Sequence, residues 1–351
     1  MFAAHVGNAD TGSVATDWLV VADGRSSAVF AVLAGVSLAL LSGGAYPGVA
    51  GGRVVRAGVA GGRDARAMDT ARTRITVRAL LIAVLGVVLT ALGTPVAVIL
   101  PVYAVLFLAA LPVLQARPAW LVTLAAVATL AGPPLAAAVT ARVAGPGGGE
   151  PSLFARPVTH LLFTGTYPAV VWVAYVLVGL AVGRADLRSV AVRGRLARLG
   201  VLGSVTGYGG SAVAQWAYHL VSAGPGGPAA ASGAARLLTA RAHDDTTFEV
   251  VGNTGVALLV LVGCLAAAER FPRLLVPLAA TSALALTVYT AQILAIAALG
   301  PLVVWAPRNS VLAVFVITAL VASTVWRRAL GRGPLERVLH TASMRAAAPL
   351  V

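Results

Sequence analysis

The sequence predicts an all-helical bundle of about nine membrane spans, with the amino terminus outside and the carboxyl terminus in the cytoplasm. Three observations support this. The 351 residues are 59% hydrophobic and only 11% charged, whereas soluble domains carry about 25% charged residues. Apolar stretches recur at the length of roughly 20 residues that a bilayer requires. Arginine falls mainly in alternate loops. A soluble globular fold is therefore excluded.

Nine apolar stretches are separated by segments rich in Arg, Gly, Pro and Asp. Irregular backbone cannot face lipid, so each stretch is expected to be helical. We expect a tight turn at 93–95 and kinks at 132–134 and Pro277. A single transmembrane domain is expected over residues 1–340, with a cytoplasmic tail over 341–351. The expected spans are 26–44, 79–93, 95–116, 119–141, 166–183, 199–221, 250–268, 274–299 and 309–326.

Arginine supplies every one of the 26 basic residues, and the net charge is +14. If the loop after the first span is cytoplasmic, twenty arginines lie on the cytoplasmic side and six on the other, which satisfies the positive-inside rule. We interpret the charge as a topology signal and an affinity for anionic membrane lipids, and expect no nucleic-acid partner. The expected location is the cytoplasmic membrane of a bacterium. The single Cys264 rules out a disulfide within one chain.

Histidines and acids gather on the predicted outer face. The segment from His243 through Asp244 to Glu249 directly precedes the seventh span. One interpretation is a helix start, in which a threonine caps the helix and Glu249 stabilises its positive end. A second is a place in a substrate site. A metal site would need ligands on fixed elements, and this stretch is expected to be loop, so no metal is predicted.

Several segments, in this order and spacing, resemble a bacterial membrane family related to the heparan-alpha-glucosaminide N-acetyltransferase catalytic domain. The resemblance covers most of the chain. It implies transfer of an acyl group from cytoplasmic acyl-CoA, such as acetyl-CoA, to an extracytoplasmic sugar or lipid-linked acceptor. In that family a helix precedes the His that matches His5. This sequence has no counterpart of that helix, and residues 6–22 contain no His. The matching segments are MFAAH (1–5), DGRSSAVFAVLAGVSLAL (23–40), LLFTGTYPAVVWVAYVLVGLAVGRADL (161–187), TTFEVVGNTGVALLVL (246–261), PLAATSALALTVYTAQ (277–292) and RGPLERVL (332–339).

The resemblance places the family's His at His5 and its Arg at Arg25. Imidazole exchanges a proton near neutral pH, so His5 is the expected general base or transient acyl acceptor. Asp23 is an expected orienting carboxylate. Arg25 is the expected electrostatic partner of the reacting group, although an arginine at a membrane edge also pairs simply with a nearby acid. The residues expected at the acceptor site are His243, Asp244, Glu249 and Gln292.

Two other functions stay open. A transporter or lipid-handling protein would use polar residues inside the spans as a path, and a truncated, inactive relative would follow from a missing first helix. The loop at 45–78 holds seven arginines, which would contact either the lipid surface or the phosphates of an acyl-CoA. The sequence sets neither the acceptor, the acyl chain nor the oligomeric state. The residues expected to line a transport path are Gln215, His219, Asn253 and Gln292.

Overall fold

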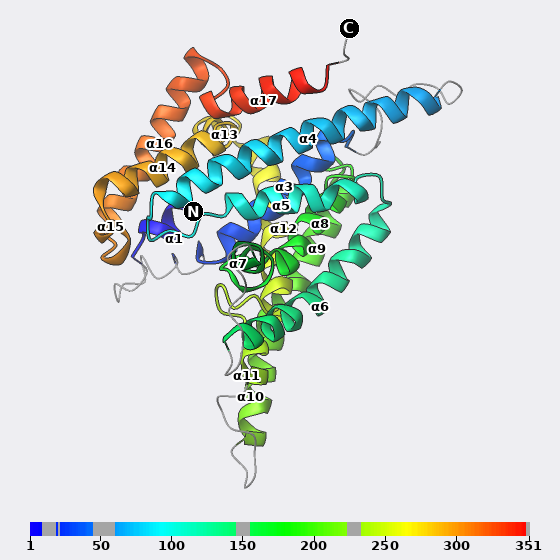
Figure 1. The fold of residues 1–351 in the computed structure, drawn as a ribbon, viewed down its shortest axis with the longest axis vertical. Coiled ribbons are helices and arrows are strands. Elements are labelled where there is room, and N and C mark those ends of the chain that lie inside the picture. Colours follow the sequence, from blue (N-terminus) through cyan, green and yellow to red (C-terminus); the bar gives the residue numbers. More distant parts are fainter. Residues whose placement is uncertain (9–18, 20–21, 45–59, 145–154, 223–232, 349–351) are drawn as a thin grey trace. The chain divides into compact units, whose positions relative to one another are not determined.

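All regular secondary structure is helical in the computed structural model, which describes residues 1–8, 19, 22–44, 60–144, 155–222 and 233–348 (Figure 1). This confirms the predicted all-helical class. The principal helices are α1 (Phe2–Val6), α3 (Arg25–Leu41), α4 (Ala60–Ala91), α5 (Leu100–Ala110) with the 3-10 turn η3 (Leu111–Val113), α6 (Pro118–Ala144), α7 (Ala155–Thr159) with the π-turn η4 (His160–Thr164), α8 (Ala169–Val182), α9 (Val190–Ser204), the π-turn η5 (Val205–Gly209), α10 (Gly210–Ser222), α11 (Gly233–Leu237), α12 (Thr247–Arg270), α13 (Val276–Ala283), α14 (Ala285–Leu299), α15 (Leu302–Trp305), α16 (Asn309–Ala329) and α17 (Pro334–Ala346).

Four helices are long and apolar enough to cross a membrane, namely parts of α4 and α6 together with α12 and α16. Two more spans result if the bent pairs η4 with α8, and α13 with α14, each cross once. The chain is thus a multi-pass membrane protein with four to six spans by length and composition. Every one of the nine predicted stretches contains a helix. Because α3 and α5 are short apolar helices, nine spans and the orientation stay predictions.

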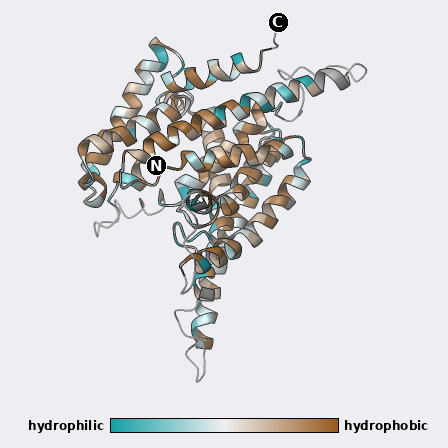
Figure 2. Ribbon diagram, in the orientation of Figure 1, coloured by the Kyte–Doolittle hydropathy of each residue, from teal (hydrophilic) through white to brown (hydrophobic). Residues whose placement is uncertain are grey.

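The outward side of α16 is a continuous apolar stripe. Val314, Ile317, Val321 and Val325 recur at helical spacing and are 58–62% exposed. Hydrophobic residues likewise run along most of the long helices (Figure 2). A water-soluble protein seldom exposes apolar surface on this scale, because each such side chain is stabilised by leaving water. The stripe therefore fits contact with lipid.

The bend in the eighth predicted stretch lies at Leu284 and not at the expected proline. The pair α13 and α14 meets there at 80°. Pro277 instead occupies the first turn of α13, where the missing N–H of proline interrupts no helical hydrogen bond. The kink expected at Pro277 is therefore wrong. Gly93 has φ of +63°, in the expected turn between α4 and α5.

The described chain divides into two compact units, and the larger is formed by residues 27–72 and 105–262. Within it, α3 and α8 approach backbone to backbone. A side chain at Gly35 would collide with the Val176 carbonyl oxygen, and one at Gly179 would collide with the Val32 carbonyl oxygen. Small residues permit this spacing, which helices in lipid need for van der Waals contact.

Arg184 follows α8 and fixes the ends of two other helices in the same unit. Its guanidinium is buried, with the residue 6% exposed, and donates to the carbonyl oxygens of Ala39 at 3.3 Å, Gly44 at 2.6 Å and Leu114. It also donates to Ser42 Oγ at 2.9 Å. The last carbonyls of a helix lack internal partners, so one cation satisfies the ends of both α3 and η3.

The second unit comprises residues 1–26, 73–104 and 263–351. Here the carboxylate of Glu336, on α17, accepts the backbone N–H groups of Leu286 at 2.8 Å and Thr287 at 3.0 Å. The Thr287 hydroxyl adds a bond of 2.6 Å. A carboxylate is stabilised at the positive amino end of a helix, so Glu336 holds α17 to the start of α14, immediately after the bend.

Candidate functional site

His5 and Gln292 contact each other in the second unit. Nδ1 of the imidazole lies 3.0 Å from Nε2 of the amide, and Gln292 is buried, at 4% exposed. A buried amide requires hydrogen-bonding partners, because an unsatisfied one loses its bonds with water. The contact therefore holds the imidazole on α1 against α14. It brings together two residues that the sequence analysis placed in different parts of the expected site.

The amino-terminal segment is tied down on α16. The ring of Phe2 meets Phe315 edge to face, with centroids 6.0 Å apart. The backbone N–H of Asn8 donates to Asn309 Oδ1 at 2.9 Å, and Asn309 Nδ2 donates to the Asn8 carbonyl at 2.9 Å. Contacts at both ends of α1 thus fix the position of His5.

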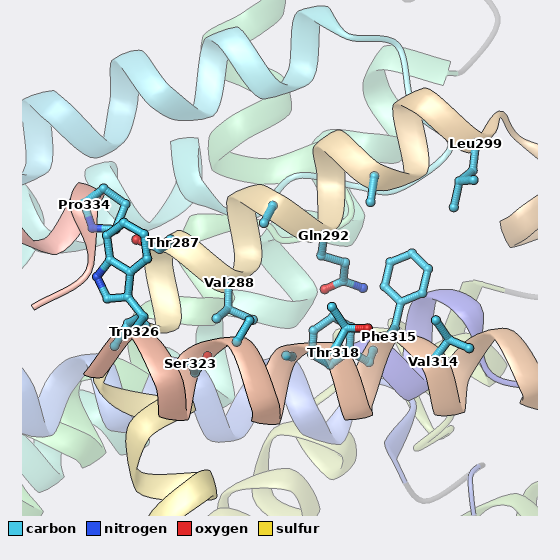
Figure 3. A pocket seen from close by; sticks show the side chains of 16 residues that line it. Thr287, Val288, Gln292, Leu299, Val314, Phe315, Thr318, Ser323, Trp326 and Pro334 are labelled. Carbon is cyan, nitrogen blue, oxygen red and sulfur yellow. The ribbon is translucent and has the colours of Figure 1, made fainter. Parts of the chain in front are cut away.

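An apolar groove of about 430 Å³ runs between α14 and α16 and reaches Gln292. Figure 3 shows Trp326 and Pro334 at one end, Leu299 and Phe315 at the other, and the Gln292 side chain pointing into the space between them. All of its lining residues belong to one unit. The groove can accommodate an extended, largely apolar group whose polar part meets the Gln292 amide.

The Gln292 amide decides which nitrogen of His5 carries the proton. With the amide NH₂ against Nδ1, the lone pair of Nδ1 is occupied and the neutral ring carries its proton on Nε2. With the amide turned by half a turn, Oε1 would face an Nδ1–H, and the lone pair of the neutral ring would then be on Nε2. The orientation of the Gln292 amide and the tautomer of His5 are therefore coupled at this contact.

Asp23 and Arg25 lie at the start of α3. The backbone N–H of Arg25 donates to the Asp23 carbonyl oxygen at 2.6 Å, around Gly24, whose φ is +65°. Both belong to the same unit as His5. The structure thus places the three expected catalytic residues in one unit.

The expected acceptor residues His243, Asp244 and Glu249 come together in the larger unit, at the start of α12. Glu249 is buried, at 4% exposed, and its carboxylate accepts the backbone N–H groups of His243 at 3.0 Å and Asp245 at 2.7 Å. The backbone N–H of Glu249 in turn donates to Thr246 Oγ1 at 3.1 Å. Thr246 therefore caps the first turn of α12, as the helix-start interpretation expects. Glu249 thus organises the loop, while Asp244 is exposed and bonded to Thr239 Oγ1.

A buried polar network extends from Glu249 into the helices. Asn253 Nδ2 donates to Glu249 Oε1 at 3.2 Å, and Tyr208 donates from its hydroxyl to Asn253 Oδ1 at 2.6 Å. Asn253 Nδ2 also lies 3.4 Å from the Tyr175 hydroxyl. Such a network fixes α8, η5 and α12 together, because each buried polar atom needs its partner.

Asp245 joins the loop to α8. Its carboxylate accepts the indole N–H of Trp172 at 2.8 Å. Burial raises the pKa of Asp245 to about 7, and the negative charge of Glu249 adds to the rise, although the Trp172 hydrogen bond and His243 oppose it. Asp245 therefore changes charge near neutral pH.

Sequence reasoning missed the role of the aromatic residues here. Tyr167, Trp172 and Tyr175 are only 2–6% exposed, so they are buried in the unit and do not form a belt at the membrane interface, where such residues are also common. They form an edge-to-face series, with centroids 4.9 Å and 5.2 Å apart. The same residue types serve both places, since an aromatic ring with one polar atom suits a membrane interface or a buried hydrogen bond equally. Among the described residues, no group of three His, Cys, Asp or Glu side chains is arranged to hold a metal ion.

The polar residues expected along a transport path belong to both units. Gln215 bonds Ser211 on its own helix, α10, and His219 is exposed. Asn253 belongs to the larger unit and Gln292 to the other.

Comparison of the chain with protein-family models, curated proteins and solved structures gives no match.

Proposed function

We propose that the protein is an integral-membrane acyltransferase that moves an acyl group, such as acetyl, from cytoplasmic acyl-CoA to an extracytoplasmic sugar or lipid-linked acceptor. The observation that carries the proposal is the His5 and Gln292 pair beside the groove of α14 and α16. A proton-exchanging imidazole held by a buried amide, next to a space for an apolar chain, is the minimum that acyl transfer needs.

The groove lies along the expected course of the acyl donor. Its Trp326 and Pro334 end is at the corner of α16 and α17, which the arginine distribution predicts to be cytoplasmic, while His5 is predicted to be outside. A thioester entering from the cytoplasmic end would bring its acyl chain toward Gln292. The predicted orientation of nine spans, with the amino terminus outside, supports this direction of transfer.

His5 has two possible parts in the reaction. As a base, Nε2 takes the proton of the acceptor hydroxyl or amine while that atom attacks the thioester carbonyl; the carbon–sulfur bond breaks and the CoA thiolate leaves, to be protonated in water. As a nucleophile, Nε2 attacks the thioester carbonyl and the carbon–sulfur bond breaks, releasing the CoA thiolate. The acceptor hydroxyl or amine then attacks the acyl-imidazole, the nitrogen–acyl bond breaks, and the acceptor proton passes to the imidazole or to water. Arg25 would stabilise the developing oxyanion, and Asp23 would orient the imidazole.

A transporter is the second function, favoured by the break between α13 and α14. Transport proteins use such interrupted helices to present helix ends to a substrate. At this break, however, the start of α14 already binds the carboxylate of Glu336. Because Glu336 already occupies the helix start that a transported substrate would need, this contact favours the enzyme over the transporter.

The test is acyl transfer in oriented membrane vesicles supplied with labelled acetyl-CoA on the cytoplasmic side. We expect label on outer-face glycans or lipids, its loss in His5→Ala, and retention in His160→Ala, which removes an exposed histidine of the larger unit. Equal labelling by His5→Ala and the unmutated chain would remove His5 from the mechanism. If the unmutated chain, His5→Ala and His160→Ala all fail to transfer label, the transporter is the remaining proposal. Solute uptake by the same vesicles tests it.

A further inference from the structure

Four basic side chains from two distant parts of the sequence gather where α17 meets α4. Arg78 Nε donates to Ser343 Oγ at 3.3 Å, which joins the two helices. Burial lowers the pKa of His340, and the positive charges of Arg332, Arg78 and Arg74 lower it further. Ser343 Oγ, which accepts from Arg78, also donates to the His340 carbonyl oxygen at 3.1 Å, and Arg74 lies one helical turn before Arg78 on α4. Packing therefore holds the cluster together within one compact unit.

The cluster lacks a balancing negative charge in the part of the chain that the structure describes. An ion pair near the cluster joins Arg72 to Asp69, and no described carboxylate forms an ion pair with Arg74, Arg78 or Arg332. Arg74 Nε is buried without a hydrogen-bond partner. The acid of α17 nearest in sequence, Glu336, is engaged by the start of α14.

Surface arginines that merely mark the cytoplasmic side of a membrane protein point separately into water or toward lipid headgroups. This cluster differs, because α17 is fixed to α14 through Glu336 and to α4 through Ser343. Those contacts hold like charges together against their repulsion. An anion with several oxygens would remove the repulsion and satisfy the free guanidinium N–H groups, which match phosphate in geometry.

We propose that Arg74, Arg78, Arg332 and His340 form a binding site for phosphate groups. The phosphates come either from the nucleotide part of CoA, which rests on the proposed function, or from the headgroup of an anionic lipid. The site adjoins the groove, since the Arg332 carbonyl accepts the indole N–H of Trp326 at 3.1 Å and Trp326 lines that groove. A CoA bound here would direct its acyl end along α14.

The test uses the full chain in phosphatidylcholine nanodiscs, with coenzyme A titrated by calorimetry. The cluster variant is Arg74→Gln with Arg332→Gln, and the control is Arg270→Gln with Arg273→Gln, which removes the same charge elsewhere in the unit. We expect the control to bind coenzyme A within twofold of the unmutated chain and the cluster variant to bind at least tenfold more weakly. His5→Ala keeps this binding, so loss of transfer and loss of the site are separate results.

A second arm identifies lipid as the source. Native mass spectrometry counts the phosphatidylglycerol molecules that each protein retains from mixed nanodiscs. The site is assigned to lipid if the unmutated chain and the control retain phosphatidylglycerol, the cluster variant does not, and coenzyme A does not bind. Without phosphate the cluster variant should unfold at or above the temperature of the unmutated chain, and inorganic phosphate should raise the unfolding temperature of the latter alone. The proposal is overturned if neither coenzyme A nor phosphatidylglycerol distinguishes the cluster variant from the control.

Discussion

The amide of Gln292 lies 3.0 Å from the imidazole of His5, although 287 residues separate them in sequence. The contact depends on α1 being held on α16, through the Phe2 and Phe315 rings and the paired hydrogen bonds of Asn8 and Asn309. An isolated helix of five residues is not stable in water. Tertiary packing alone therefore forms α1 and positions its histidine.

Replacing Gln292 with Leu is expected to lower the free energy of unfolding by about 1 kcal/mol, the usual net value of one hydrogen bond. The side chain is buried and faces His5, while Leu has similar volume. Chemical denaturation in detergent measures the change. Gln215→Leu is the control, because the described contacts of Gln215 lie within α10. An equal loss of unfolding free energy in this control would show that the contact of Gln292 with His5 contributes nothing specific.

Stability should fall as pH rises from about 4 to about 7. The Asp245 carboxyl titrates at about 7 in the fold and at its ordinary value of 3.8 in the unfolded chain. Between these values the folded chain binds more protons, so raising the pH favours unfolding. Thermal unfolding at pH 5.5 and pH 8 should differ for the unmutated chain and less for Asp245→Asn. The exposed Asp244→Asn should retain the full difference.

Replacing Arg184 with Met should destabilise the larger unit by about 3 kcal/mol, since hydrogen bonds to a charged group contribute about 1.5–3 kcal/mol each and several carbonyls lose their donor together. The measurement is unfolding in detergent. Arg188→Met removes an exposed arginine a few residues later and is expected to change the free energy by about 0.5 kcal/mol at most. Equal effects of the two substitutions would refute the capping role.

A leucine at Gly179 should prevent the close approach of α3 and α8. Even a Cβ at this position collides with the Val32 carbonyl oxygen, so the helices must separate and lose their packing. The unfolding temperature should fall by several degrees, for a loss of about 1–3 kcal/mol. Gly263→Leu on α12 is the control, since no atom lies within 4 Å of a Cβ there; a similar fall would show that added bulk alone is harmful.

The predicted orientation can be tested with single cysteines after Cys264→Ser removes the native thiol. An impermeant maleimide should label Ala240→Cys, which precedes α12, in intact cells. It should label Ala348→Cys, after α17, only once the cells are permeabilised. The opposite pattern would reverse the orientation and with it the proposed direction of acyl transfer.

The membrane class, the helical content and most helix positions are predictable from the sequence alone. These follow from local properties, since an apolar segment of sufficient length must satisfy its own backbone in lipid. The cap of α12 by Thr246 and Glu249 was also predictable, because its partners are only three residues apart. The expected bend at Pro277 was not found, because proline in the first turn of a helix is harmless and the break at Leu284 has no comparable local mark.

Which polar residues contact one another depends on how the helices pack. Helical periodicity could not pair His5 with Gln292, Trp172 with Asp245, or Arg78 with Ser343, because each pair is brought together by packing between helices distant in sequence. For the same reason the burial of Tyr175, which is 2% exposed, could not be predicted from the sequence. Composition sets which solvent a helix prefers, whereas the helices packed around a side chain set whether it faces lipid, water or another polar group.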